Sequence, residues 1–196
     1  MVDEHVAKLP RRKLVVLTVA SDRRMRNERG EPVERERELD ERVRCEDVSG
    51  LRILKASAAY HGLRLVALGT QEPFSGFGSK LLLPLAWGEQ QLASGALRRS
   101  DVVLFTDAFD TFFACGEEEI LRKLAAAEAE AREQDGAQGV LLVSGERFCW
   151  PSEERSGRFP AAPTPYRFLN GGGCVGAAGD YLEQVRGARP RMEEGD

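Results

Sequence analysis

Two carboxylates, Asp107 and Asp110, follow directly after the short apolar run 102–105. An apolar run of this length predicts a strand that is covered on both faces of a sheet. Carboxylates at the end of such a strand suit a hard cation such as Mg²⁺ or Mn²⁺, which commonly bridges protein oxygens to phosphates. The alternative is that one aspartate caps a turn while the other is solvated. The spacing is one residue too long for the D-x-D-x-T pattern of phosphatases, so an aspartyl-phosphate enzyme is not expected.

Three further features could meet a ligand. Lys80 follows the glycine-rich segment 74–78 and starts a predicted helix, where it could bind a phosphate or could simply be solvated. The glycines Gly171–Gly173, after Asn170, would let the backbone approach a ligand closely, or would only form a bulge or tight turn. Trp150, next to a proline, could stack on a ring or could merely pack. The triple glycine lacks the G-x-G-x-x-G spacing, so a Rossmann dehydrogenase is not expected.

Strands and helices alternate around these residues. Apolar runs predict strands at 14–20, 63–68, 102–105 and 140–143. Helical spacing of apolar residues predicts helices at 51–61, 80–94, 117–134 and 180–186. This alternation predicts an α/β fold with an open, mostly parallel sheet and flanking helices, in which ligands bind beyond the carboxyl ends of the strands.

The composition disfavours several classes of function. The chain carries 28 basic and 32 acidic side chains, and its net charge of −4 predicts no attraction to nucleic acid or to acidic membranes. No apolar run could span a bilayer, and the first residues lack the apolar stretch of a secretory signal. Two histidines, His5 and His61, are poorly placed for a Ser/His/Asp or Cys/His site. Four cysteines without a C-x-x-C pair suggest neither a zinc site nor a redox motif, and buried free thiols are expected rather than disulfides.

One segment differs sharply from the rest in composition. Between Asp22 and Asp47, 18 of 26 residues are charged, and the signs alternate. Such a segment cannot join a core, so we expect a solvated insertion, either an ion-paired helix or an irregular surface loop.

Four segments together resemble the N-terminal glycosyltransferase domain of the procollagen-lysine hydroxylases, the lysyl hydroxylase and glycosyltransferase family. They keep the family's order and spacing and are LVVLTVA (14–20), DVVLFTDAFD (101–110), SGERFCWP (144–151) and RFLNGGGCVG (167–176). The resemblance covers most of residues 13–186 apart from the charged insertion. It implies a GT-A-like nucleotide-diphospho-sugar transferase fold, with Mn²⁺ or Mg²⁺ bound to the diphosphate of a UDP-sugar donor.

The resemblance also implies a reaction, a location and a set of site residues. Glucose or galactose would pass from UDP-glucose or UDP-galactose to a hydroxylysine-type or related protein or glycan acceptor, such as a collagen-like chain, in the endoplasmic reticulum lumen. Asp107 and Asp110 would hold the metal, and Glu146 and Trp150 would lie on the sugar side as catalytic residues. The implied donor-binding residues are Thr18 in the uridine pocket, Lys80 at the nucleotide, Phe109 in place of the family's usual stacking tyrosine, and Asn170, Gly171 and Gly172 as the floor.

The family continues past the equivalent of Asp196 into an Asp-rich stretch and, much later, a metal-binding histidine. The resemblance therefore implies that residues 1–196 form a single, incomplete domain that binds UDP and Mn²⁺ weakly. Two classes of function stay open at this point. One is a metal-dependent UDP-sugar transferase, and the other is a non-catalytic sugar-nucleotide-binding or structural domain.

Overall fold

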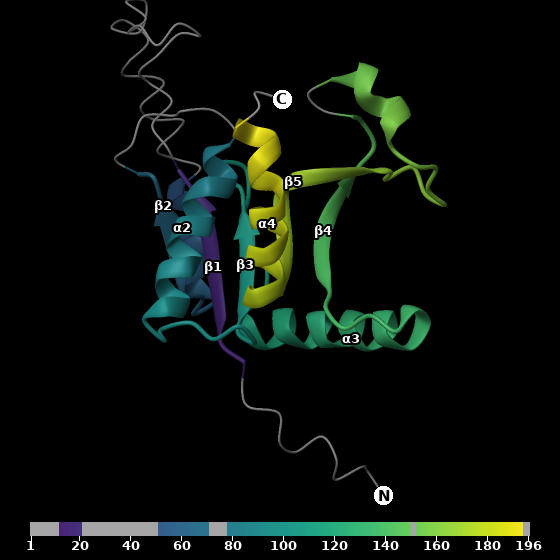
Figure 1. Ribbon diagram of the computed structural model, residues 1–196. Helices are drawn as coiled ribbons and strands as arrows, with labels where there is room; N and C mark the ends of the chain where they lie inside the picture. The colour runs from purple at the N-terminus through teal and green to yellow at the C-terminus, as the bar shows by residue number, and fades with distance from the viewer. Residues whose placement is uncertain (1–11, 21–50, 71–77, 150–151, 194–196) are drawn as a thin grey trace, which may run out of the picture.

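The computed structural model describes residues 12–20, 51–70, 78–149 and 152–193 (Figure 1). Within them lies a five-stranded sheet with the strand order β2-β1-β3-β5-β4. Its strands are β1 (Leu14–Val19), β2 (Leu65–Leu68), β3 (Val102–Thr106), β4 (Leu141–Glu146) and β5 (Phe168–Ala177). The first four are the strands predicted from the apolar runs, so that part of the α/β prediction is confirmed.

The sheet is mixed, and the prediction of a mostly parallel sheet needs correction. β1 pairs in parallel with β2 and β3, whereas β5 is antiparallel to both β3 and β4. Parallel neighbours need a long crossover, usually a helix, but antiparallel ones need only a loop. The described part of the β4–β5 connection, residues 147–149 and 152–167, holds the short 3₁₀ helix η3 (Glu153–Arg158) rather than an α-helix. The chain can therefore return antiparallel to β4.

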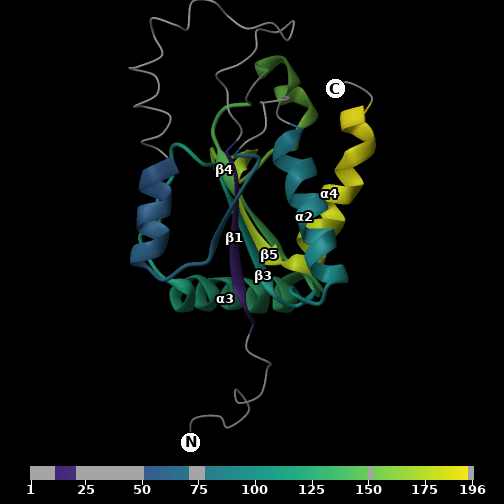
Figure 2. The same cartoon turned by 90° about the vertical axis from the view of Figure 1, so that its left-hand side faces the viewer.

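One face of the sheet is covered by α2 (Ser79–Ala93) and α4 (Ala178–Glu193) (Figure 2). The core on this side joins the odd-numbered residues of β1 to both helices, through Val15, Leu17, Val19, Leu85, Tyr181 and Leu182. The two helices pack closely, because a Cβ at Gly88 would lie only 2.5 Å from the Cδ2 of Leu182. Both elements were predicted, although α4 begins two residues earlier than expected.

The opposite face is covered by the helix over residues 51–60 and by α3 (Glu117–Asp135), which runs across the lower end of the sheet (Figure 2). Its core joins Leu14 and Val16 of β1 to Ala58 and Leu124 of these helices. The alternation of β1 side chains between the two cores explains why all residues of this strand except Thr18 are apolar. A structure with helices on both faces leaves the sheet's ends as the places where polar groups can gather.

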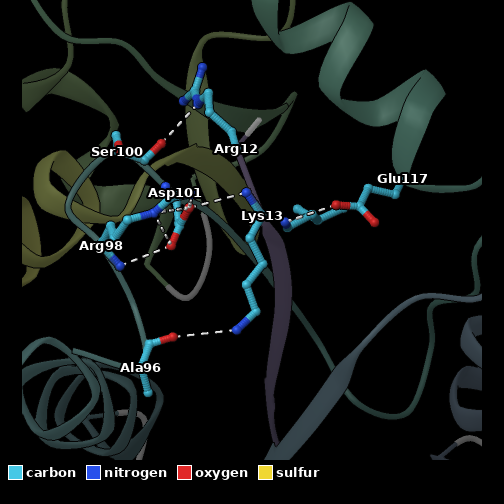
Figure 3. Close-up of polar contacts among 8 residues, drawn as sticks. Arg12, Lys13, Ala96, Arg98, Ser100, Asp101 and Glu117 are labelled. Carbon is cyan, nitrogen blue, oxygen red and sulfur yellow. Dashed lines mark hydrogen bonds and ion pairs between the residues drawn. The ribbon is translucent and has the colours of Figure 1, made fainter. Parts of the chain in front are cut away.

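A polar cluster ties the amino ends of β1 and β3 together (Figure 3). Asp101 is buried and accepts hydrogen bonds from the backbone nitrogens of Lys13 (3.1 Å) and Arg98 (2.9 Å) and from the Arg98 Nη2 (2.7 Å). Burial by itself would raise the pKa of Asp101, but these hydrogen bonds outweigh it and lower the pKa to about 2.

Further contacts extend this cluster toward α3. The Nε of Arg12 donates to the carbonyl of Ser100 (2.9 Å), and the Oε1 of Glu117 accepts from the backbone nitrogen of Leu14 (3.1 Å). The amino end of β1 is therefore fixed by side chains from two elements, which leaves the carboxyl end of the sheet as the candidate ligand-binding edge.

The charged insertion predicted for residues 22–47 lies outside the described residues. Among the residues described, no helix has both the length and the apolar character needed to cross a membrane. The thiols of Cys115, Cys149 and Cys174 are free.

Candidate functional site

Five predicted site residues gather at the carboxyl end of β3. Asp107 directly follows β3, and Lys80 lies in the first turn of α2. Asn170 and Gly172 are near this edge because β5 is antiparallel to β3, so that its early residues lie beside the end of β3. Glu146 ends β4, which runs in the same direction as β3. The sheet topology thus brings together segments far apart in the sequence.

Lys80 and Asp107 form an ion pair, with 2.5 Å between the Nζ and the Oδ1. Their side chains are only 25% and 27% exposed, so the two charges meet in a partly desolvated place. An ion pair in such surroundings is screened less by salt than one on the open surface. The carboxylate predicted to hold a metal is therefore already balanced by a cation from this chain.

Asp107 also rests against a glycine of β5. The backbone nitrogen of Asp107 donates to the carbonyl of Gly172 (2.9 Å), which extends the pairing of β3 with β5 by one residue. A Cβ at Gly172 would lie 2.6 Å from the Oδ2 of Asp107 and 2.8 Å from the Oδ1 of Asn170. Only a residue without a side chain leaves room for both oxygen atoms at these positions.

Asn170 connects this glycine to Glu146. Its Oδ1 accepts from the backbone nitrogen of Gly172 (2.6 Å), and its Nδ2 donates to the Oε2 of Glu146 (3.1 Å). Both bonds use the amide in the same orientation, so the two contacts agree on which atom is nitrogen. A continuous series of contacts therefore runs from Lys80 through Asp107, Gly172 and Asn170 to Glu146.

The three glycines form a bulge opposite β4. Val143 pairs with Cys174, but the next residue, Ser144, pairs with Asn170. Residues 171–173 therefore have no pairing partner in β4, while Gly173 still pairs with Thr106 of β3. The bulge that the sequence left as an alternative is present, and it returns Asn170 to the β4 ladder two residues from Glu146.

The turn after Asp107 is held by threonine hydroxyls. The Oγ1 of Thr111 donates to the carbonyl of Asp107 and lies 3.2 Å from the Oγ1 of Thr106. Phe109 is half-buried in this turn and Asp110 is exposed. Both residues lie in the segment directly after Asp107, and their roles in binding stay predictions.

The donor set can be tested against a hard divalent cation. Among the described residues, no group of three or more His, Cys, Asp or Glu side chains is arranged so that it could hold a metal ion. Asp107 and Asp110 would supply two carboxylates, and Mg²⁺-like ions in phosphate sites usually take one or two carboxylates together with waters and substrate phosphates. The partly buried Asp107 already balances a positive charge, that of Lys80. These residues fit such a cation, with its other ligands coming from outside this pair.

The other predicted residues are less connected to this series of contacts. Thr18 is fully buried in β1, and its Oγ1 has no hydrogen-bond partner among the described residues. It pairs in register with Ala67 of β2, on the face covered by the helix over residues 51–60. Gly171 is exposed, and a Cβ there would meet nothing within 4 Å. Trp150 lies outside the described residues.

A cavity of about 480 Å³ opens on the same flank as Thr18. It lies between the helix over residues 51–60 and β2 and is lined by Lys55, Ala58, Ala59, Leu63, Leu65, Ala67 and Thr70. None of the predicted site residues is among its lining residues. It therefore marks a hollow beside the predicted uridine pocket rather than the centre of the candidate site.

Arg167 has a structural role that the sequence reasoning did not assign. Its guanidinium donates to the carbonyls of Ser156 (2.8 Å), Phe159 and Pro160 (2.9 Å). It also lies over the ring of Phe168, 5.2 Å from the ring centroid. The loop before β5 is thus fastened to the start of the strand that carries Asn170. The arginine stands in the quoted segment RFLNGGGCVG, but only the folded loop shows what it binds.

The comparisons with known proteins agree with the resemblance seen in the sequence. The family model of the PLOD GT domain matches residues 41–194. The multifunctional procollagen lysine hydroxylase and glycosyltransferase LH3 of Homo sapiens is 30% identical over 171 residues, which cover 85% of this chain and 22% of that protein. The LH3 protein of Rattus norvegicus is 26% identical over 185 residues, or 92% of this chain and 23% of the relative.

Relatives with a different printed activity match as well. Procollagen-lysine,2-oxoglutarate 5-dioxygenase 1 of Bos taurus is 29% identical over 147 residues, which cover 73% of this chain and 19% of that protein. The chain spans about a fifth of the length of the curated relatives it matches. The family match covers most of the chain, including the segments that carry Asp107, Glu146 and Asn170. The chain therefore belongs to the PLOD glycosyltransferase-domain family and is a distant homologue of the lysyl hydroxylases.

Proposed function

We propose that this chain is a metal-dependent glycosyltransferase domain of the GT-A type that uses a UDP-sugar as donor. The donor sugar is glucose or galactose, and the acceptor is a hydroxylysine-type or related protein group. The observation that supports this most directly is Asp107, held at the carboxyl end of β3 by Lys80 and Gly172 within a domain of the PLOD glycosyltransferase family.

Asp107 and Asp110 would hold Mn²⁺ or Mg²⁺, which supplies Lewis-acid stabilisation of the negative charge on a leaving diphosphate. Lys80 adds a second positive charge beside the same carboxylate and is suited to a phosphate oxygen. Gly172 lets the backbone of β5 approach a ligand without a side chain in the way. Asn170 holds the carboxylate of Glu146 by a hydrogen bond, and the role proposed for this carboxylate is to orient an acceptor hydroxyl.

Binding of UDP should be measured by calorimetry with and without Mn²⁺, for the unaltered chain and for Asp107→Asn and Asp110→Asn. We expect either change to weaken the Mn²⁺-dependent binding of UDP by ten- to a hundredfold, since each tenfold loss is about 1.4 kcal/mol. Asp135→Asn is the matched control, because this exposed carboxylate ends α3, at the other end of the sheet. Unchanged titrations for both site variants would contradict the metal assignment.

Consumption of UDP-glucose and UDP-galactose, with and without a hydroxylysine-containing peptide, tests the reaction itself. Transfer to the peptide supports the transferase. Binding of UDP and Mn²⁺ without any consumption of donor would instead support a non-catalytic sugar-nucleotide-binding domain. If transfer is observed, Glu146→Gln tests the role of this side chain. A catalytic role predicts lost transfer with unchanged UDP binding.

A further inference from the structure

The carboxylate assigned to a divalent cation is already paired with an ammonium group. The Nζ of Lys80 lies 2.5 Å from the Oδ1 of Asp107, in surroundings that leave only about a quarter of each side chain exposed. The other oxygen, Oδ2, lies against Gly172, where a Cβ would be only 2.6 Å away from it. A cation bound to either oxygen of this carboxylate would therefore lie close to the ammonium group of Lys80.

A divalent cation and an ammonium group that bind the same carboxylate repel each other strongly, because their positive charges are then only a short distance apart in a partly desolvated place. Lysine is a compact charge on a flexible four-carbon stem, so its charge can move while α2 stays in place. The backbone of Asp107 does not have this freedom, because its nitrogen donates a hydrogen bond to the carbonyl of Gly172.

We propose that Lys80 is a placeholder cation, which balances Asp107 while the metal is absent and is displaced when the metal binds. The displaced ammonium is then available to the diphosphate of the donor, so the metal and the nucleotide bind cooperatively. This inference rests on the proposed function, because it takes Asp107 as a ligand of the divalent cation. It goes beyond that function by giving Lys80 two successive partners and by predicting a coupling between two ligands.

The proposal predicts opposite effects of one substitution on two measurements. Lys80→Met removes the competing charge and keeps an unbranched side chain of similar length. We expect Mn²⁺ alone to bind about tenfold more tightly to this variant, while UDP in the presence of Mn²⁺ binds about tenfold more weakly. Lys80→Arg keeps the charge and should stay near the unaltered chain for Mn²⁺ alone. A lysine that only stabilises the fold would not produce this reversal.

The measurement is Mn²⁺ binding followed by the loss of the free-ion paramagnetic resonance signal, with and without UDP, on the full chain. Lys80→Gln serves as a second neutral variant, circular dichroism checks that each variant is folded, and Lys123→Met on exposed α3 is the matched control. In the double variant Lys80→Met with Asp107→Asn, the gain in Mn²⁺ affinity should disappear, because the carboxylate that pairs with Lys80 has been removed.

The outcomes separate this inference from the proposed function. If UDP binding depends on Mn²⁺ and on Asp107, but neither neutral variant tightens Mn²⁺ alone, the placeholder role is overturned and the proposed function stands. If the unaltered chain binds no Mn²⁺ but a neutral variant does, the placeholder role is supported. If no variant binds Mn²⁺, both ideas are wrong.

Discussion

Replacing Gly172 with alanine should disturb the candidate site more than any other single-methyl change in the triple glycine. The new Cβ would lie 2.6 Å from the Oδ2 of Asp107 and 2.8 Å from the Oδ1 of Asn170, whereas ordinary contact begins at 3.4 Å. Both oxygens belong to groups that already make bonds, to Lys80 and to the backbone nitrogen of residue 172. Relief of the overlap must therefore lengthen or break at least one of these bonds.

The size of the effect follows from what must move. Distorting one charge-assisted hydrogen bond and one amide hydrogen bond, together with the steric overlap, should cost about 1–3 kcal/mol of the free energy of unfolding. For a chain of this size, about 2–4 °C of melting temperature corresponds to each kcal/mol, so we expect a fall of roughly 2–12 °C. Mn²⁺-dependent binding of UDP should weaken by about tenfold or more, because Asp107 is displaced.

Gly171→Ala is the matched control, since it adds the same methyl group one residue away. A Cβ at Gly171 meets nothing within 4 Å, and its backbone is not in the left-handed region. We expect its melting temperature to change by no more than corresponds to about 0.5 kcal/mol. Equal melting temperatures for the two alanine variants would refute the steric argument. A destabilised Gly172→Ala protein with unchanged UDP and Mn²⁺ binding would refute the link between this contact and the site.

Two further predictions concern single ionisable groups. The pKa of Asp101 is lowered from 3.8 to about 2 in the folded chain, so the stabilisation that this carboxylate provides is complete above pH 4 and is lost as the pH falls toward 2. The loss is at most about 2 kcal/mol, and less where solvent screens Arg98. Asp101→Asn should flatten this part of the pH profile of the free energy of unfolding, measured by chemical denaturation, and an unchanged slope would show that other groups cause it. Burial raises the pKa of the Cys174 thiol to about 11, and the thiolate is the form that reacts. At pH 8 its alkylation by iodoacetamide should therefore be about a hundredfold slower in the folded than in the denatured chain. Equal alkylation rates, measured by peptide mapping, would contradict the burial of this thiol.

The strands β1 and β3 could be predicted because their signal is local. Short, nearly continuous apolar runs indicate strands whose neighbours lie on both sides, and β1 indeed supplies residues to both cores. β5 was missed because Gly171–Gly173 weaken the strand pattern and a loop precedes it. Its ten residues are a strand because β3 and β4 bond to it, and that pairing is not visible in the local sequence.

In the candidate site, too, the residues could be predicted from local sequence, whereas the contacts between them could not. Asp107 and Lys80 could be singled out by type and by position after a strand or at a helix start, so both were predicted before any geometry was known. Their mutual ion pair could not be, because it joins residues 27 positions apart through the packing of α2 on β1, the strand next to β3. The hydrogen bond between Asn170 and Glu146 needed still more, namely the register of β4 against β5 with its bulge.

The bulge explains why two interpretations of the triple glycine do not compete. A regular β5 would keep one residue opposite each residue of β4, and Asn170 would then lie three pairs farther along the ladder than Ser144. By leaving the β4 ladder for Gly171–Gly173, the strand keeps its bonds to β3 and still brings Asn170 opposite Ser144. The same absence of side chains makes room for Asp107 over Gly172. Bulge and ligand approach are one arrangement, because the irregular backbone is what places the amide of Asn170 between the carboxylates of Asp107 and Glu146.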